Sequence, residues 1–266
     1  MCAIASTPSP ERNRGFTLVE IAIAVFIITL LLGSILVPLH TQVEQRQISE
    51  TQKMLEDIKE ALIGHALAKG YLPCPDRTSG GAGGPGSNDY ANDGVEDYSA
   101  GNCIGTLSGS GSTQRAVGNV PWVTLGLGIS DPWGNRFRYS VDMDFTNHST
   151  PFSLSSTADI CVGATAIACV SPWTGRLTAG TPGPDGAVAV ILSHGKNGRS
   201  AMGAQTNTAN PAATSADELD NVGGTGFTSR PITALAPNDA NYFDDIVTWL
   251  SKYPLYQRMV AGGKLP

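Results

Sequence analysis

The chain has 266 residues and a net charge of −6, and 41% of its residues are apolar. The acidic balance excludes a nucleic-acid-binding surface that works through bulk positive charge. With 31 glycines and 17 prolines the chain is not of low complexity, and its length and apolar content allow a sizeable core. A soluble cytosolic enzyme is disfavoured by where the apolar residues lie along the chain.

The longest apolar run covers residues 16–39 and contains one ionisable residue, Glu20. As a helix, a run of about 20 apolar residues matches the thickness of a bilayer core. Arg12 and Arg14 precede the run, and by the positive-inside rule they keep the N-terminus in the cytoplasm. We therefore expect residues 16–39 to span a membrane once, with the rest of the chain outside.

Two other export signals fit this segment poorly. A cleaved secretory signal peptide has an apolar region of about 7–15 residues followed by a small-x-small cleavage site. Here the run is longer, and no such site follows Leu39. A lipoprotein signal is excluded because the nearby Cys2 has no apolar run before it.

Glu20 is the unusual residue of the apolar run, because a carboxylate in a membrane segment is costly and marks a functional position. The segment Arg14-Gly15-Phe16-Thr17-Leu18-Val19-Glu20 resembles the leader junction of type IV pilins and type II secretion pseudopilins. The resemblance implies that residues 1–15 are a leader. A prepilin peptidase would cut after Gly15 and methylate the new N-terminal Phe16.

The same resemblance implies that Glu20 pairs with the N-terminal amine of a neighbouring subunit. Physical reasoning leads to the same expectation. A carboxylate and an ammonium that are each buried in an apolar helix bundle favour the register in which they meet. Glu20 is therefore the predicted assembly residue.

Beyond the apolar run, residues 40–69 have the pattern of an amphipathic helix. Apolar residues recur at helical spacing, and charged residues occupy the other face. Lys69-Gly70 and the following Pro73 form a stop signal. We expect one helix over residues 16–69, with bends at Gly33 and Pro38. The predicted apolar stripe consists of Ile48, Leu55, Ile58, Leu62 and Ala66.

The remaining residues, 70–266, are predicted to form a globular head with short strands and long loops. With the helix this gives the expected fold class, an α+β pilin-like fold in which a long N-terminal helix packs on an antiparallel sheet. The loops are expected at 79–89 and 201–226. A final helix is expected at Tyr242–Ser251. The predicted strands are Val120–Leu125, Arg136–Asp142, Phe152–Leu154, Asp159–Val162 and Ala187–Leu192.

Four head segments are similar to a pattern in the heads of minor pilins and pseudopilins. One of them, Asp131-Pro132-Trp133-Gly134-Asn135, has the residues of a turn that opens a strand, so we interpret it as structural. The head is larger than that of a major pseudopilin, which favours a minor subunit. The segments begin at Leu72, Asp93, Val120 and Asp131.

Four cysteines remain after removal of the leader, and an even number in an exported chain predicts disulfide bonds. They allow three connectivities. We favour the local pairs Cys74–Cys103 and Cys161–Cys169, because each brackets a loop. A zinc site is the rival, although the sequence lacks the Cys-x2-Cys spacing that would support it.

The densest acidic segment is residues 88–97, which contains Asp89, Asp93 and Asp97. It matches part of a calcium-loop pattern, but Ala91 and Ala100 occupy positions that should carry ligands. Some pseudopilins bind calcium in head loops. We expect no required cofactor, and calcium at these three aspartates is the one candidate beside a solvated turn.

The sequence lacks the motifs of metalloproteases, serine hydrolases and P-loop proteins. The stretch that most resembles a catalytic loop is residues 193–198, Ser-His-Gly-Lys-Asn-Gly. Pseudopilins have a similar loop after the corresponding strand, so we expect no enzymatic activity.

The sequence therefore predicts a pilin-like subunit of a type IV pilus or a type II secretion pseudopilus. The expected partners are a prepilin peptidase, other pilin or pseudopilin subunits and the inner membrane, with the head in the periplasm. The alternative is a periplasmic binding or enzymatic domain for which the helix is only a tether. N-terminal sequencing of the mature protein distinguishes the two.

Overall fold

The computed structural model describes residues 15–79, 87–88, 91–108, 114–158, 160–164, 186–222 and 226–266, without the side chains of residues 33–40. The chain divides into two compact units, Met1–Arg46 and Gln47–Pro266, and each is described by itself.

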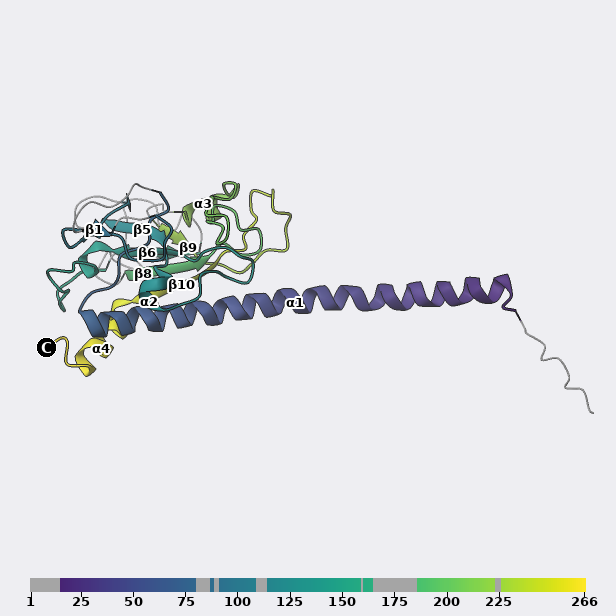
Figure 1. Cartoon of the computed structure of the whole chain (residues 1–266), viewed down its shortest axis with the longest axis horizontal. Helices are drawn as coiled ribbons and strands as arrows, with labels where there is room; N and C mark the ends of the chain where they lie inside the picture. Colours follow the sequence, from purple (N-terminus) through teal and green to yellow (C-terminus); the bar gives the residue numbers. More distant parts are fainter. Residues whose placement is uncertain are drawn as a thin grey trace, which may run out of the picture. The chain divides into compact units, whose positions relative to one another are not determined.

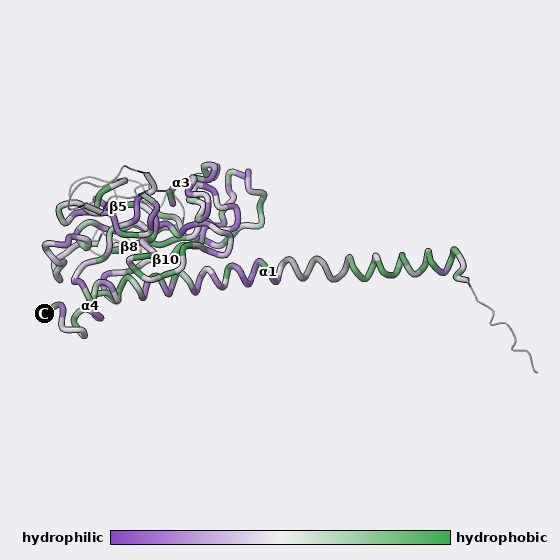
Figure 2. The backbone as a smooth tube through the Cα atoms, viewed as in Figure 1, coloured by the Kyte–Doolittle hydropathy of each residue, from purple (hydrophilic) through white to green (hydrophobic). Residues whose placement is uncertain are grey.

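Helix α1 covers Leu18–Lys69 and is the main element of the N-terminal unit. It is continuous through Gly33 and Pro38, so the two predicted bend points do not interrupt it. The apolar residues between Phe16 and Leu32 are largely exposed, and Figure 2 shows them as a hydrophobic stretch of the helix. The sequence predicts a membrane span over residues 16–39. Within the described residues, however, no helix is both long enough and apolar enough to cross a membrane.

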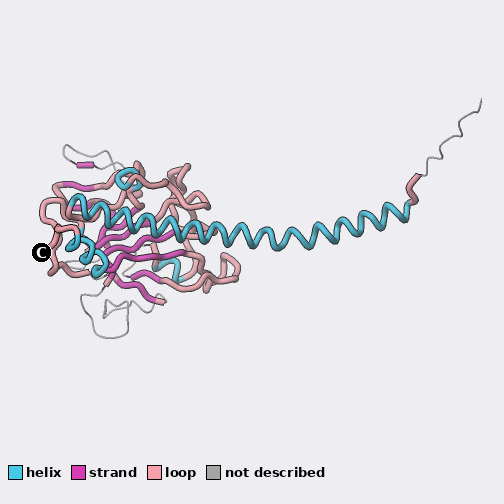
Figure 3. Tube along the Cα trace, turned by 90° about the horizontal axis from the view of Figure 1, so that it is seen from below, coloured by secondary structure: helices cyan, strands magenta, loops and turns pink. Residues whose placement is uncertain are grey.

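The C-terminal turns of α1 belong to the second unit and pack on the head. Leu55, Ile58, Leu62 and Ala66 are buried, as predicted from their spacing, and Ile48 is partly buried against the same core. The two views agree that these turns lie over the strands of the main sheet (Figures 1 and 3). Burial of this apolar stripe fixes the helix to the head.

The main sheet has five antiparallel strands in the order β10-β8-β6-β5-β4. Each strand pairs with its neighbours in chain order, so the sheet is a meander with long insertions. The fold is therefore α+β with an antiparallel head, as predicted. Its strands are β4 (Thr106–Ser108), β5 (Arg115–Asn119), β6 (Arg138–Asp142), β8 (Ala187–Ser193) and β10 (Ile246–Ser251).

Strand β8 lies in the middle of the head and is buried over its whole length. Ile191 faces the core that α1 covers, together with Tyr139 and Val141 of β6. Val190 and Leu192 belong to a second core on the other side. That side is covered by a two-stranded parallel sheet of β7 (Cys161–Gly163) and β9 (Gly226–Thr228).

The strands predicted at Arg136–Asp142 and Ala187–Leu192 are confirmed as β6 and β8. Strand β7 overlaps the strand predicted at Asp159–Val162, of which Asp159 lies outside the described residues. Two other strand predictions are wrong. Pro121 cannot donate to a strand ladder, and the chain forms the short helix α2 (Trp122–Leu125) instead. Phe152–Leu154 pairs with no strand, and the ring of Phe152 packs near Phe145 and Tyr256.

The predicted helix at Tyr242–Ser251 is also wrong, because β10 occupies Ile246–Ser251 and pairs with β8. Its β-branched and aromatic residues favour an extended chain. The final helix, α4, follows directly at Lys252–Ala261 and buries Leu255, Tyr256 and Met259.

The smaller elements lie between α1 and the main sheet or in the insertions between the sheet strands. The predicted loop 201–226 contains α3 (Ala216–Asp220), and most of the predicted loop 79–89 lies outside the described residues. The others are the 3-10 helix η2 (Met143–Phe145) and a small antiparallel sheet of β1 (Ser87–Asn88), β2 (Tyr98–Ser99) and β3 (Asn102–Cys103).

The segment Asp131–Asn135 forms the predicted turn. Oδ1 of Asp131 accepts hydrogen bonds from the backbone N–H groups of Trp133 and Asn135, at 3.0 and 2.9 Å. Gly134 has a φ of +82°, a conformation that glycine adopts without strain. Oδ2 of Asp131 accepts from the hydroxyl of Ser193 at 2.6 Å, which ties the turn to the end of β8.

Candidate functional site

The predicted leader junction lies in a non-helical segment directly ahead of helix α1. Residues 15–17 are not helical, and the helix begins at Leu18. Gly15 has open space around it, and the side chain of Phe16 is 81% exposed. A protease needs access to the peptide bond that it cuts, and the Gly15–Phe16 bond lies in an exposed segment outside the helix.

Thr17 and Glu20 form a capping box at the start of the helix. Oε2 of Glu20 accepts from both the backbone N–H and the hydroxyl of Thr17, each at 2.9 Å. Oγ1 of Thr17 accepts from the backbone N–H of Glu20 at 3.2 Å. Two N–H groups that would lack a helical partner are thereby satisfied. The sequence reasoning assigned Glu20 only to assembly, although the spacing Thr-x-x-Glu already indicates a cap.

The disulfide prediction is confirmed for the first pair. Cys74 and Cys103 are bonded and buried, and the bond joins the segment after α1 to strand β3. Cys161 is disulfide-bonded and buried in β7, but Cys169 lies outside the described residues. The pair Cys161–Cys169 therefore stays a prediction.

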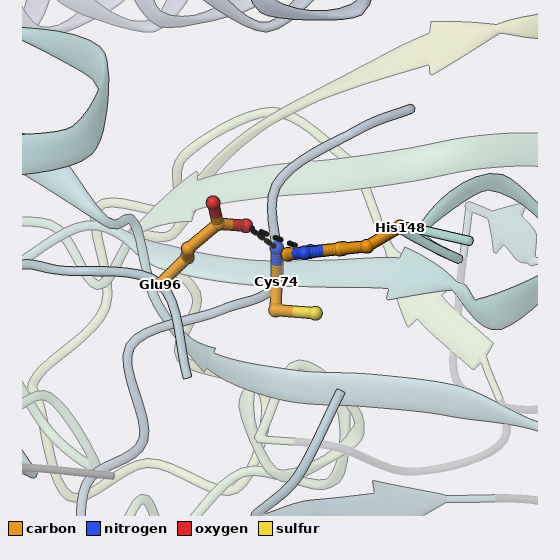
Figure 4. A group of neighbouring side chains, drawn as sticks. All are labelled: Cys74, Glu96 and His148. Atoms are coloured by element: carbon orange, nitrogen blue, oxygen red, sulfur yellow. Dashed lines mark hydrogen bonds and ion pairs between the residues drawn. The ribbon is translucent and has the colours of Figure 1, made fainter. Parts of the chain in front are cut away.

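Glu96 and His148 lie beside Cys74 (Figure 4). Oε2 of Glu96 accepts from the backbone N–H of Cys74 at 3.1 Å and is 3.2 Å from Nε2 of His148. The imidazole ring stacks on Tyr71, with 4.1 Å between the ring centroids. Since the sulfur of Cys74 is committed to the disulfide bond, it offers no thiolate to a metal. This group holds the helix end against the head.

The residues predicted to bind calcium have backbone partners. Oδ1 of Asp93 accepts from the N–H of Val95 at 2.8 Å, and Oδ2 of Asp97 accepts from the N–H of Arg77 at 2.7 Å. Asp89 lies outside the described residues. In the described part of the chain, no cluster of potential metal ligands includes Asp93 or Asp97. Calcium binding at these aspartates stays a prediction.

Asp76 organises the same loop, which the sequence reasoning missed. Its two carboxylate oxygens accept from the N–H groups of Asn92 and Gly94, at 2.8 and 3.0 Å. Burial raises the pKa of Asp76 to about 7, although these hydrogen bonds act in the opposite direction.

A cluster of three buried carboxylates lies beyond the end of β8, where Glu218, Asp244 and Asp245 offer oxygen atoms within 4.8 Å of one another. Asp244 accepts from the N–H of Asn197 at 2.8 Å and from the hydroxyl of Tyr242 at 2.9 Å. Burial and the neighbouring Asp245 raise the pKa of Glu218 to about 8. Glu218 therefore carries a proton at neutral pH, which removes one of three repelling charges.

The loop at residues 193–198, which in the sequence most resembles a catalytic loop, lies beside this carboxylate cluster. Nδ1 of His194 is 3.4 Å from Oδ1 of Asp245, and the imidazole is 1% exposed. The hydroxyl of Ser193 donates to Asp131 and is therefore not paired with His194 as a nucleophile would be. Sequence spacing could not reveal the cluster, because its members come from three distant segments.

Comparison with protein families gave a match at the N-terminal segment. The family model of the prokaryotic N-terminal methylation motif matches residues 11–36, which include the junction and the first turns of α1. This motif makes the chain a type IV pilin-like or pseudopilin-like protein. Comparison with curated proteins and with solved structures gave no match.

The match covers the part of this pilin-like chain that carries Gly15, Phe16 and Glu20. It implies processing by prepilin peptidase and, in general, membrane anchoring and assembly in a pilus or pseudopilus. The head lies outside the matched residues, so its properties come from the structure alone.

Replacing Thr17 with alanine should weaken the start of α1, because it removes two of the three capping hydrogen bonds. Loss of an N-cap costs about 1 kcal/mol, which corresponds to roughly fivefold faster exchange of the first helical amides. Hydrogen exchange of residues 18–21 measures the effect, with Thr17→Ser as the control that keeps the hydroxyl. Equal exchange rates in the two variants would show that the cap does not stabilise the helix.

The head should lose stability as the pH rises. The folded-state pKa of Glu218, about 8, is above its ordinary value of 4.5, so the folded form holds this proton more tightly. The contribution is fully present below about pH 4.5 and disappears as the pH rises through 8. We expect a loss on the order of a few kcal/mol between pH 5 and 8.

Denaturant unfolding at a series of pH values, in buffers containing a chelator, measures this dependence. Glu218→Gln retains the size of the side chain and does not titrate, so its stability should change less with pH. A wild-type chain whose stability is constant or increases from pH 5 to 8 would contradict the assignment.

Proposed function

We propose that the chain is a structural subunit that prepilin peptidase cuts between Gly15 and Phe16 and that assembles through helix α1 into a type IV pilus or a type II secretion pseudopilus. The observation that carries the proposal is the matched motif at residues 11–36, which lies on an exposed junction and a capped helix start. In this function the chain is not an enzyme.

Processing would create the group that assembly needs. Hydrolysis of the Gly15–Phe16 amide adds water across the bond and leaves a carboxylate on Gly15 and an ammonium on Phe16. Transfer of one methyl group from a sulfonium donor to the Phe16 nitrogen leaves a secondary amine, which still carries a positive charge at neutral pH. The mature chain therefore begins with a cation four residues before the carboxylate of Glu20.

The carboxylate of Glu20 can accept hydrogen bonds from Thr17 and from a neighbouring subunit at the same time. Both of its capping hydrogen bonds go to Oε2. A carboxylate has about four lone-pair sites, so Oε1 can accept from the Phe16 ammonium of a neighbouring subunit while the cap remains. In an apolar bundle of helices this pairing would select one register between subunits.

The exposed apolar residues of α1 support the same assembly. Large side chains from Phe16 to Leu32 are mostly half or more exposed in the single chain. Exposed apolar surface of this extent marks a membrane or protein interface. We propose that it contacts lipid of the inner membrane first and the helices of neighbouring subunits after assembly.

The proposed location places the head in the periplasm. Arg12 and Arg14 favour a cytoplasmic N-terminus, and the buried disulfide Cys74–Cys103 suits an oxidising compartment. The size of the head, with its long insertions between sheet strands, supports a minor rather than a major subunit.

The first test is the N-terminus of the mature protein, expressed with and without prepilin peptidase and analysed by mass spectrometry. With the peptidase, we expect a chain that begins at Phe16 and carries one added methyl group. A chain that retains Met1, or one cut after Leu39, would contradict the proposal and indicate a tethered periplasmic domain.

The second test separates the charge of Glu20 from its capping role. Glu20→Gln retains an acceptor for the Thr17 N–H but lacks the negative charge, whereas Glu20→Ala lacks both. We expect both variants to be cleaved, and both to enter the filament at a tenth of the wild-type level or less. Quantitative immunoblotting of sheared filaments measures this level, and normal incorporation of Glu20→Gln would refute the charge pairing.

A further inference from the structure

The head contains a polar cavity of about 80 Å³ that the proposed function does not use. Two arginines and a histidine line it, together with hydroxyl and amide side chains. Arg138 begins strand β6, Arg136 precedes it by two residues, and His194 follows strand β8. The other polar side chains are those of Thr78, Asn119 and Ser200.

The two guanidinium groups have only neutral hydrogen-bond acceptors. Arg136 donates through Nη1 to Oδ1 of Asn92 at 2.8 Å and through Nη2 to Oδ1 of Asn207. Arg138 donates through Nη2 to the carbonyl oxygen of Val222. In the described part of the chain, neither arginine has an ion-pair partner within 4.0 Å.

Four nitrogen atoms of these side chains are buried without a hydrogen-bond partner: Nε of Arg136, Nε of Arg138 and both ring nitrogens of His194, of which Nδ1 lies 3.4 Å from Oδ1 of Asp245. Arg136 is 2% exposed and His194 is 1% exposed. Leaving a charged donor buried and unpaired is costly, so such groups normally have an acceptor. Because all three side chains line the same cavity, one acceptor in it could serve them together.

The nearby carboxylates do not provide that acceptor. Asp76 accepts from two backbone N–H groups, Asp131 accepts from Ser193, and Asp245 accepts from Asn221 at 2.7 Å. Asp76 and Asp245 act on the arginines only through space. Burial lowers the pKa of Arg138 to about 10, which is the direction expected for a cation without an adjacent counter-charge.

The surroundings hold Arg136 in place. Its Cζ lies 4.3 Å from the centroid of a Trp122 ring, so the indole stacks on the guanidinium. On the other side Asn207, which has a φ of +52°, presents its side-chain oxygen to Nη2. A guanidinium fixed in this way is pre-organised for a ligand, because little side-chain freedom remains to be lost.

We propose that this cavity binds a compact tetrahedral oxyanion such as phosphate or sulfate. Its donors come from β6, from the end of β8 and from the segments around Thr78 and Ser200, and a tetrahedral anion accepts from several directions at once. A cavity of about 80 Å³ suits an anion of this size. Nε2 of His194 can donate to the anion whenever the ring carries a proton on that nitrogen.

The test is isothermal titration of the full-length chain in non-ionic detergent with inorganic phosphate, sulfate or acetate, at an ionic strength held constant with chloride. We expect one phosphate or sulfate per chain and at least tenfold weaker binding of acetate. Arg138→Gln should weaken phosphate binding at least tenfold. Arg258→Gln is the matched control, because Arg258 is exposed, pairs with Glu60 and gives the same change of charge.

Several results would overturn the proposal. Titration heats for phosphate that equal those for chloride would mean that water alone fills the cavity. Acetate binding as tight as phosphate binding would refute the tetrahedral assignment. An equal loss in Arg258→Gln and Arg138→Gln would indicate non-specific attraction. If Arg138→Gln does not fold, Arg136→Lys replaces it in the test, because lysine retains the positive charge but lacks the Nε–H. Phosphate binding should then be at least tenfold weaker in Arg136→Lys than in the wild type. The wild-type titrations with phosphate, sulfate and acetate are read as before.

Discussion

Burial of strand β8 on both faces is the constraint on which the rest of the head depends. Every residue from Ala187 to Ser193 is buried. One face requires the apolar stripe of α1, and the other requires the parallel pair β7 and β9. Since a strand covered on both sides needs an almost unbroken apolar run, the segment Ala-Val-Ala-Val-Ile-Leu is the sequence counterpart of this arrangement. The C-terminal turns of the helix that carries the N-terminal methylation motif are thereby fixed to the head.

The parts of the fold that the sequence predicts are those with a strong local pattern. The stripe of α1 and the continuous apolar run of β8 can be recognised without knowing their partners. The segment of strand β10 is predicted to be helical from its local pattern, with Asn238 or Asp239 as the helix cap. Its residues Ile246 to Trp249 favour a strand, but the decisive factor is pairing with β8, which is a tertiary interaction.

The same distinction applies to the functional residues. Gly15, Phe16 and Glu20 lie in the linear motif that the family model matches at residues 11–36, so local sequence alone is enough to single them out, and the cap of Thr17 on Glu20 follows from spacing alone. The buried carboxylates Glu218, Asp244 and Asp245 could not be predicted, because the fold brings together residues about 25 positions apart. Likewise, the sequence alone does not distinguish Arg136 and Arg138 from ordinary polar residues of a strand. Only the fold shows that they line a cavity together with His194.

The order of the elements along the chain also has a consequence for folding. Strand β10 and helix α4 follow all the other described elements, yet β10 pairs with β8, and Leu255 and Met259 belong to the same core as Leu55 and Leu62. The head therefore cannot be completed before the segment 246–261 has been added. Until then β8 has an unpaired edge, and the apolar stripe of α1 is partly uncovered. Both are surfaces through which unfinished chains can associate with one another.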